Sequence, residues 1–212
     1  MKVRTGKRAL AGAIVLLLIL LAAISVLRWQ GYDGWDKAAA DAVADWRSDA
    51  WTSAGRLMNE LGATAAIGAI TILSAAYWGL RREWKVAFSF VGVVLLAYLL
   101  QMSLKAAFGW ERPGGAWGID HDGYGYPSGN ASIAAALYGW WLLLAGYMLR
   151  SRLMRVVVGA IAVLMIVATC WSRVYFSVHY LSDVAAGCCV GGICALAAGF
   201  ICFWRRRSSV FY

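Results

Sequence analysis

The sequence predicts an all-α protein: a polytopic membrane bundle of six transmembrane helices with a short amphipathic helical loop on its outer side. Composition is the first reason, because the chain is 62% hydrophobic and only 15% charged, whereas soluble domains are ~45–50% apolar. The second reason is a series of six long apolar runs, each close to the ~20 residues that a membrane-spanning helix needs. Little sequence is left for anything else, so we expect residues 1–212 to form a single membrane domain.

The first apolar run follows a basic stretch and could be read as a signal peptide. It is too long for that role and lacks a clear small-residue cleavage site, so we expect a retained helix. Short polar turns separate the later runs. The six predicted spans are residues 9–27, 61–80, 86–108, 130–149, 156–176 and 183–204.

The Lys and Arg residues alternate between crowded and sparse turns. They crowd in residues 2–8, 81–85, 150–155 and 205–207, which fall on one side of the membrane if there are six spans. The positive-inside rule makes that side cytoplasmic and places both termini there. Topology thus explains much of the net charge of +9. Because no single basic face results, we expect a lipid bilayer and no nucleic acid as partner.

The outer loop, residues 30–60, alternates tryptophans and small apolar residues with Asp and Lys at roughly helical spacing. This pattern suits an amphipathic helix lying in the membrane interface, where Trp is enriched. A short cap over the bundle is an equal alternative.

Three cations remain that topology does not explain. Lys105 interrupts the third apolar run near its outer end, Arg112 follows that run, and Arg173 ends the fifth. A charge at membrane depth is costly, so a functional role is the first hypothesis. Snorkelling to the outer headgroups is the alternative, but it explains a single residue better than three on the same side.

The segment 123–130, Gly-Tyr-Gly-Tyr-Pro-Ser-Gly-Asn, lies on the same outer side and leads into the fourth helix. A Gly-rich turn at a helix start offers backbone N–H groups to an anion. Ser128 can add a hydroxyl donor or act as the N-cap. An ordinary capped turn would explain this segment alone, but not its cationic neighbours.

His179 and Asp183 are four residues apart and share a face if this stretch is helical. A carboxylate there can accept the N–H of one imidazole nitrogen and leave the other as a nucleophile or base. Such pairs are also common as structural contacts. Nearby cations would stabilise a transferring phosphoryl group, so the combination indicates phosphoryl chemistry.

Together these residues resemble the type 2 phosphatidic acid phosphatase superfamily, which also includes vanadium haloperoxidases and glucose-6-phosphatase. The first motif, Lys, six residues, then Arg-Pro, matches Lys105 and Arg112-Pro113. The second, Pro-Ser-Gly-His, stands here as residues 127–130 with Asn130 at its end. The third, Ser-Arg, five residues, His, three residues, Asp, matches residues 172–183. The motif-bearing core is therefore residues 86–204.

The resemblance implies a phosphatase that uses no metal and no cofactor. His179 would attack phosphorus to form a phosphohistidine, which water would hydrolyse, and Asp183 would orient His179. The five cysteines fit this reading, since they lie in apolar runs without metal-ligand spacing and are expected to be packing residues. The residues implied to hold the phosphate are Lys105, Arg112, Ser128, Gly129 and Arg173.

The general acid of the family is the His of the second motif, and here that position is Asn130. An amide has no titratable proton near neutral pH, so we expect impaired turnover by this chain. Three explanations stay open. Asn130 could be an engineered replacement; a natural variant could use a good leaving group such as a diphosphate, or another acid such as His121; or the protein could be a non-catalytic phospholipid binder.

A site at the outer surface favours a lipid phosphate substrate. Polyprenyl diphosphate, phosphatidylglycerophosphate, phosphatidic acid and lipid A all fit, and the sequence does not choose among them. A lipid-to-lipid phosphotransferase would use the same residues, and a transporter is a further alternative. Short loops and six spans resemble bacterial members of the superfamily, so we expect a multi-pass protein of the bacterial inner membrane, part of the cell envelope, with its site facing the periplasm.

Overall fold

The computed structural model describes residues 2–114, 117, 119 and 123–205, and every regular element within these ranges is an α-helix. The predicted all-α class is therefore confirmed. The helices are α1 (Lys2–Trp29), α2 (Gly34–Asp45), α3 (Asp49–Leu61), α4 (Thr64–Leu80), α5 (Trp84–Phe108), α6 (Gly129–Met148), α7 (Arg152–Tyr175) and α8 (Leu181–Arg205).

Five of these helices, α1, α5, α6, α7 and α8, are long and apolar enough to cross a membrane. The short helix α4 has 17 residues and continues α3 across a bend of 50°. Counting that bent pair as one span gives six, in agreement with the predicted polytopic bundle. The predicted second span starts too early at residue 61, because Leu61 still belongs to α3 and the bend lies at residues 62–63.

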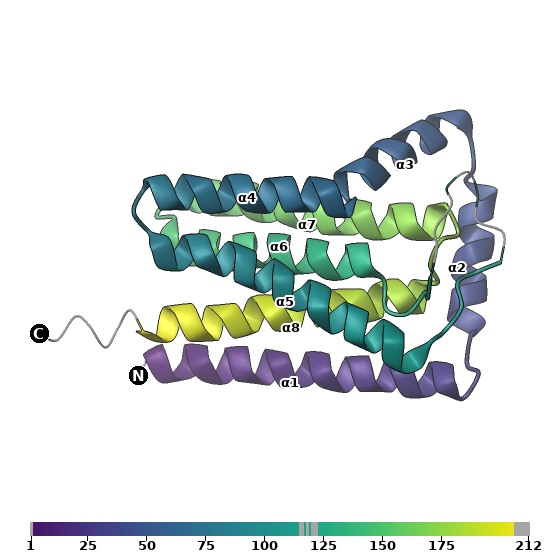
Figure 1. Cartoon of the computed structure of the whole chain (residues 1–212), viewed down its shortest axis with the longest axis horizontal. Coiled ribbons are helices and arrows are strands. Elements are labelled where there is room, and N and C mark those ends of the chain that lie inside the picture. Colours follow the sequence, from purple (N-terminus) through teal and green to yellow (C-terminus); the bar gives the residue numbers. More distant parts are fainter. Residues whose placement is uncertain (1, 115–116, 118, 120–122, 206–212) are drawn as a thin grey trace, which may run out of the picture.

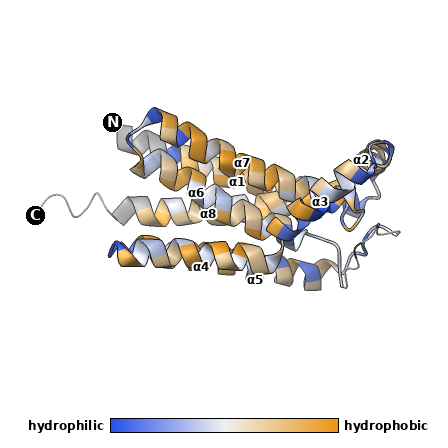
Figure 2. Ribbon diagram, turned by 90° about the horizontal axis from the view of Figure 1, so that it is seen from above, coloured by the Kyte–Doolittle hydropathy of each residue, from blue (hydrophilic) through white to orange (hydrophobic). Residues whose placement is uncertain are grey.

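The apolar helices run side by side, and both described ends of the chain lie at the same end of the bundle (Figure 1). The α4–α5 and α6–α7 turns lie there too, so the Lys and Arg residues of these turns gather at what we call the basic end. At the opposite end α2 crosses the bundle and α3 tilts away from α4 (Figure 1). Hydrophobic residues dominate the long helices, whereas α2 and α3 are more mixed (Figure 2).

The outer loop forms two helices, α2 and α3, instead of one. Ser48 separates them and caps α3, since its side chain accepts a hydrogen bond from the backbone N–H of Trp51 at 3.4 Å. Both helices contact α7, and Gly55 of α3 lies against the ring of Phe176. The loop therefore covers the end of the bundle, as the capping alternative requires, while Trp46 and Trp51 remain exposed.

Helices α6 and α8 form the centre of the bundle and approach each other very closely. A Cβ atom on Gly187 would lie 2.6 Å from the carbonyl oxygen of Ser128. A Cβ atom on Gly191 would overlap the carbonyl oxygen of Ser132. Only glycine permits this approach, so these two glycines of α8 serve packing within one bundle. The contact also fixes where the start of α6 lies relative to the start of α8.

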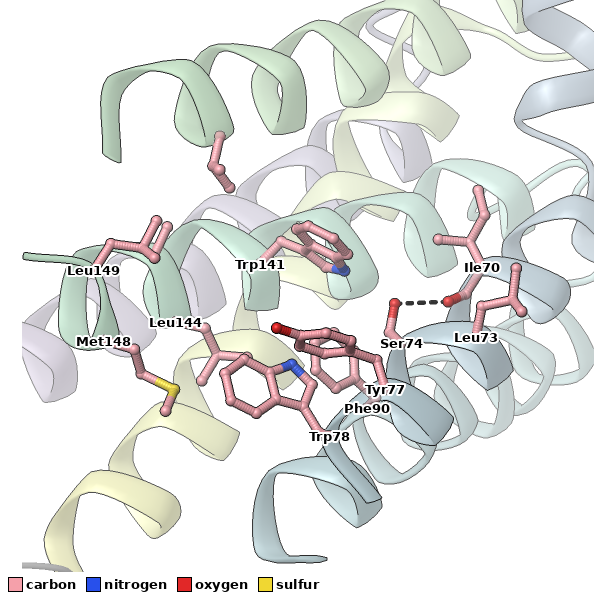
Figure 3. A pocket seen from close by; sticks show the side chains of 12 residues that line it. Ile70, Leu73, Ser74, Tyr77, Trp78, Phe90, Trp141, Leu144, Met148 and Leu149 are labelled. Atoms are coloured by element: carbon pink, nitrogen blue, oxygen red, sulfur yellow. Dashed lines mark hydrogen bonds between the residues drawn. The ribbon is translucent and has the colours of Figure 1, made fainter. Parts of the chain in front are cut away.

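A separate apolar pocket of about 510 Å³ opens between α4, α5, α6 and α7 towards the basic end (Figure 3). Aromatic side chains such as Tyr77, Trp78 and Trp141 line it. The Ser74 hydroxyl there donates to the carbonyl of Ile70 at 2.7 Å. This pocket shares no lining residue with the predicted phosphate site.

We expect Gly191→Ala to destabilise the protein by about 1–3 kcal/mol, because the added methyl group overpacks the α6–α8 contact. Gly92→Ala on α5 is the matched control, since its Cβ would meet nothing within 4 Å, and it should be neutral or slightly stabilising. Thermal denaturation in detergent measures both. Equal Tm values for the two variants would contradict the packing argument.

Candidate active site

The first predicted motif lies at the end of α5. Gly109 ends this helix in the left-handed conformation, with a φ of 62°, and its N–H bonds the carbonyl of Lys105 at 3.0 Å. Lys105 therefore lies in the last turn of α5. Its Nζ donates to the backbone carbonyl of Tyr124 at 2.5 Å, which ties α5 to the Gly-rich segment.

Arg112 links three segments of the site. Its Nε donates to the carbonyl of Gly123 at 3.0 Å, and its Nη1 donates to that of Val178 at 2.8 Å. Nη1 also lies 3.0 Å from Nε2 of His179. The guanidinium thus joins the loop after α5, the Gly-rich segment and the turn before α8.

Ser128 occupies the N-cap position of α6, but its side chain makes no capping hydrogen bond. Its backbone N–H donates to the carbonyl of Asp183 at 2.9 Å, whereas its hydroxyl is fully buried and has no hydrogen-bond partner among the described residues. An ordinary capped turn therefore does not describe this segment. A buried hydroxyl beside a helix N-terminus suits an anionic ligand.

Gly129 begins α6 against a buried amide side chain. A Cβ atom on Gly129 would lie 3.1 Å from Oε1 of Gln101, and Gln101 is only 3% exposed. Gln101 lies on α5 one turn before Lys105. Sequence analysis missed it, since a lone Gln in an apolar run carries no motif.

Arg173 lies in the last turn of α7 and is 1% exposed. Its Nη2 donates to the backbone carbonyl of Asn59 at 3.1 Å. The Asn130 amide satisfies its neighbours when its oxygen faces Arg173: the oxygen then accepts from Nη1 and Nη2 at 3.0 Å each, and its nitrogen donates to the hydroxyl of Thr64 at 3.2 Å. Asn130, at the position predicted for the general acid, therefore lies next to Arg173.

His179 lies in the turn before α8 and not on a continuous helix with Asp183, since α8 begins at Leu181. The two side chains still meet, with Nδ1 of His179 3.4 Å from Oδ2 of Asp183. Arg112 is always protonated and can only donate, so Nε2 of His179 is the acceptor of the Arg112 contact. The proton of the neutral ring is then on Nδ1, facing Asp183, and Nε2 carries the lone pair.

Burial lowers the pKa of His179 to about 4. The hydrogen bond and charge of Asp183 oppose this shift, while the cations Arg112 and Lys105 reinforce it. The imidazole is consequently neutral at physiological pH. A neutral ring with an unprotonated Nε2 is the form that a nucleophile requires.

The predicted site residues thus gather at one end of the bundle, from α5, the loop after it, the start of α6, the end of α7 and the start of α8. His121, the alternative acid, lies outside the described residues. Sequence analysis also missed Arg28, which forms an ion pair with Asp183. Its position at the end of the first apolar run is typical of a snorkelling cation, so nothing in the sequence distinguished it.

The depressed pKa of His179 predicts a stability change with pH. The unfolded histidine, with a pKa of 6.5, binds a proton at higher pH than the folded one, so stability is full above about pH 6.5 and falls as pH approaches 4. The loss is roughly 3 kcal/mol. We expect the Tm of the protein in detergent to fall over this window more steeply than that of His179→Gln. Parallel curves would show that the folded ring is not held neutral.

Known proteins share this fold. A phosphatidylglycerolphosphate phosphatase of the transmembrane PAP2 type from Bacillus subtilis superposes with a TM-score of 0.75 at 22% identity, over 96% of this chain and 98% of that one. LpxE from Aquifex aeolicus superposes with a TM-score of 0.61 at 20% identity, over 75% of this chain and 91% of that one. No curated protein sequence gives a significant match. The model of the PAP2 superfamily matches residues 86–208, more than half of the chain and all of its motifs, and the protein therefore belongs to the PAP2 superfamily.

Proposed function

We propose that this protein is a lipid phosphatase that hydrolyses a headgroup phosphomonoester or diphosphate through a phosphohistidine at His179. The observation that carries the proposal is the chain of contacts from Arg112 to His179 to Asp183, which leaves the lone pair on Nε2 of His179. Membership of the PAP2 superfamily supports phosphatase activity. The similarly folded Bacillus subtilis protein is named a phosphatidylglycerolphosphate phosphatase, which supports a lipid substrate.

In the proposed reaction, Nε2 of His179 attacks phosphorus, and the bond from phosphorus to the leaving oxygen breaks. Asp183 stabilises the positive charge that develops on the ring through the Nδ1 proton. Water then attacks the phosphohistidine, which releases phosphate and restores the free ring. The phosphate oxygens would be held by Lys105, Arg112, Arg173, the Ser128 hydroxyl and the Gly129 N–H.

The leaving oxygen needs a proton, and Asn130 cannot supply one. Its amide nitrogen donates to Thr64 and its oxygen accepts from Arg173, so the amide serves the local structure and not proton transfer. General acids typically contribute ~10²–10⁴-fold to a rate. We therefore propose a slow enzyme, best suited to a leaving group that needs little protonation, such as the phosphate of a diphosphate.

A groove beside the site supports a substrate with a hydrocarbon tail. It has a volume of about 530 Å³ and lies between α1 and α5, lined by side chains such as Leu21, Ala22 and Leu104. Leu104 precedes Lys105 in the chain. Ser25, at the edge of the groove, contacts the Tyr126 hydroxyl at 2.6 Å. The groove therefore runs along the apolar helices to within one residue of a proposed phosphate ligand.

We further propose that the protein resides in the bacterial inner membrane with both termini in the cytoplasm and the site facing the periplasm. The positive-inside rule assigns the basic end to the cytoplasm, and the site lies at the opposite end. Candidate substrates are polyprenyl diphosphate, phosphatidylglycerophosphate, phosphatidic acid and the phosphates of lipid A.

Restoring the acid tests the proposed reaction. We expect Asn130→His to raise the rate of phosphate release from a lipid phosphate by about 10²–10⁴-fold, because the imidazole can protonate the leaving oxygen. Phosphate release in detergent-lipid micelles measures the change. Absence of any gain would contradict the assignment of Asn130 to the acid position.

The control for this experiment is His179→Ala in the Asn130→His background. It should abolish both phosphate release and the acid-labile label that forms on the chain when ³²P-labelled lipid is mixed with the enzyme. Phosphate release that survives this substitution would exclude His179 as the nucleophile.

Filling the groove tests the lipid assignment. Ala22→Trp should slow hydrolysis of a long-chain phosphatidic acid at least tenfold and leave that of a short-chain, water-soluble analogue nearly unchanged, because only the long tail needs the groove. Ala160→Trp places the same bulk in an open depression between α6 and α7 that shares no lining residue with the groove, and it should slow neither. Equal effects of both variants on the long-chain substrate would argue against the groove.

A further inference from the structure

Arg28 lies at the end of α1, outside the residues that the superfamily model matches. Its Nη1 forms an ion pair with Oδ1 of Asp183 and donates to the hydroxyl of Ser182 at 2.9 Å. The side chain of Asp183 is fully buried, and that of Arg28 is 13% exposed. A charge buried away from water is costly unless it has such a partner.

We propose that Arg28 is a positioning residue of the phosphatase site, which holds the carboxylate of Asp183 so that one of its oxygens faces Nδ1 of His179. This inference rests on the proposed function, because it takes Asp183 to be the residue that orients the nucleophile. It extends the site to α1, a helix that none of the three sequence motifs includes.

The two oxygens of Asp183 have different partners. Oδ1 is held by Arg28. Oδ2 accepts the backbone N–H of Tyr180 at 2.9 Å and faces Nδ1 of His179 at 3.4 Å. Rotation of the carboxylate out of this plane would break both sets of contacts, so Arg28 and the Tyr180 N–H together fix the plane of the carboxylate relative to the imidazole.

The guanidinium of Arg28 is itself held in place by aromatic rings. Its central carbon lies 4.8 Å from the ring centroid of Tyr180, 5.1 Å from that of Trp110 and 5.5 Å from that of Tyr126. These are cation–π distances, and the three rings come from different segments of the site. Arg28 therefore presents a fixed donor to Asp183.

A second contact secures the start of α8. Asp36 of α2 is 4% exposed, and its carboxylate accepts both the backbone N–H and the hydroxyl of Ser182 at 2.7 Å each. The Ser182 hydroxyl in turn accepts from Arg28. Helices α1 and α2 thus hold the first turn of α8, the turn that carries Asp183.

Besides Arg28 and the Asp36 carboxylate that holds Ser182, further charged or titratable groups act near Asp183. His179 precedes α8, Arg112 contacts His179 from the loop after α5, Lys105 approaches from α5, and Tyr126 precedes α6. Only Arg28 and His179 form ion-pair contacts with the carboxylate among the described residues. Removing Arg28 should therefore disturb the orientation of the Asp183 carboxylate more than removing any cation farther away.

The test compares Arg28→Gln, Arg28→Lys and the control Arg47→Gln in the full-length protein. Arg47 is a matched control because it is also half-buried at the site end, bonds Ser177 at 2.8 Å and lies over the ring of Trp117, but does not contact Asp183. We expect Arg28→Gln to lower kcat about 10–100-fold, as for lost partners of functional histidines in metal sites, with KM unchanged.

The conservative variant separates positioning from a structural role. Arg28→Lys keeps the charge but not the planar fork, so it should restore only part of kcat and leave KM unchanged. Unchanged kcat in Arg28→Gln, or an equal loss in Arg47→Gln, would overturn the proposal.

Two further readouts keep the test decisive. If Arg28→Gln does not fold, Arg28→Lys decides alone, and wild-type kcat in that variant overturns the proposal.

If the wild-type chain releases no phosphate, the proposed function fails. The rate at which diethyl pyrocarbonate modifies His179, followed by mass spectrometry, still reports the orientation of the ring. A changed rate in Arg28→Gln but not in Arg47→Gln supports positioning, and an unchanged rate overturns it.

Discussion

The buried carboxylate of Asp183 is the group on which the geometry of this site depends. Its backbone carbonyl accepts the N–H of Ser128 and so holds the start of α6 against that of α8. Its side chain pairs with Arg28 and faces His179. A fully buried charge is tolerated only when it is paired and hydrogen-bonded, so this carboxylate depends on these partners. The same contacts therefore serve both the stability of the fold and the arrangement of the candidate site.

Much of the bundle could be predicted from hydrophobicity alone, because each span is an apolar run and the basic residues mark alternate turns. The bend at residues 62–63 could not, since Gly62 there packs so closely on α7 that a Cβ atom would lie 2.6 Å from the side chain of Thr169, and no local pattern marks such an approach. The motifs placed Lys105, His179 and their neighbours correctly at one end of the bundle. The Arg28 contact joins residues 155 positions apart, and no local pattern reports such a pair.

Backbone carbonyls play a large part in holding the cations of the site. Lys105 donates to Tyr124, Arg112 to Gly123 and Val178, and Arg173 to Asn59. Contact with a carbonyl satisfies a donor without cancelling its charge, unlike contact with a carboxylate. This fixes the side chains at positions set by the loops and leaves positive potential for the proposed phosphate ligand. It also explains why the irregular segments between helices, and not the helices alone, shape the site.

If the proposed mechanism holds, the contact between Asn130 and Arg173 gives a physical reason for stability and turnover to conflict at this position. The amide oxygen accepts both terminal nitrogens of Arg173 and introduces no charge. A protonated imidazole there would face a guanidinium at the same short range, and like charges so close are unfavourable. Bound phosphate, lying among the cations, would offset that repulsion. Under the proposed mechanism, a histidine at residue 130 would thus be costly in the empty protein and effective in the complex, whereas Asn130 would favour the empty protein at the expense of proton transfer.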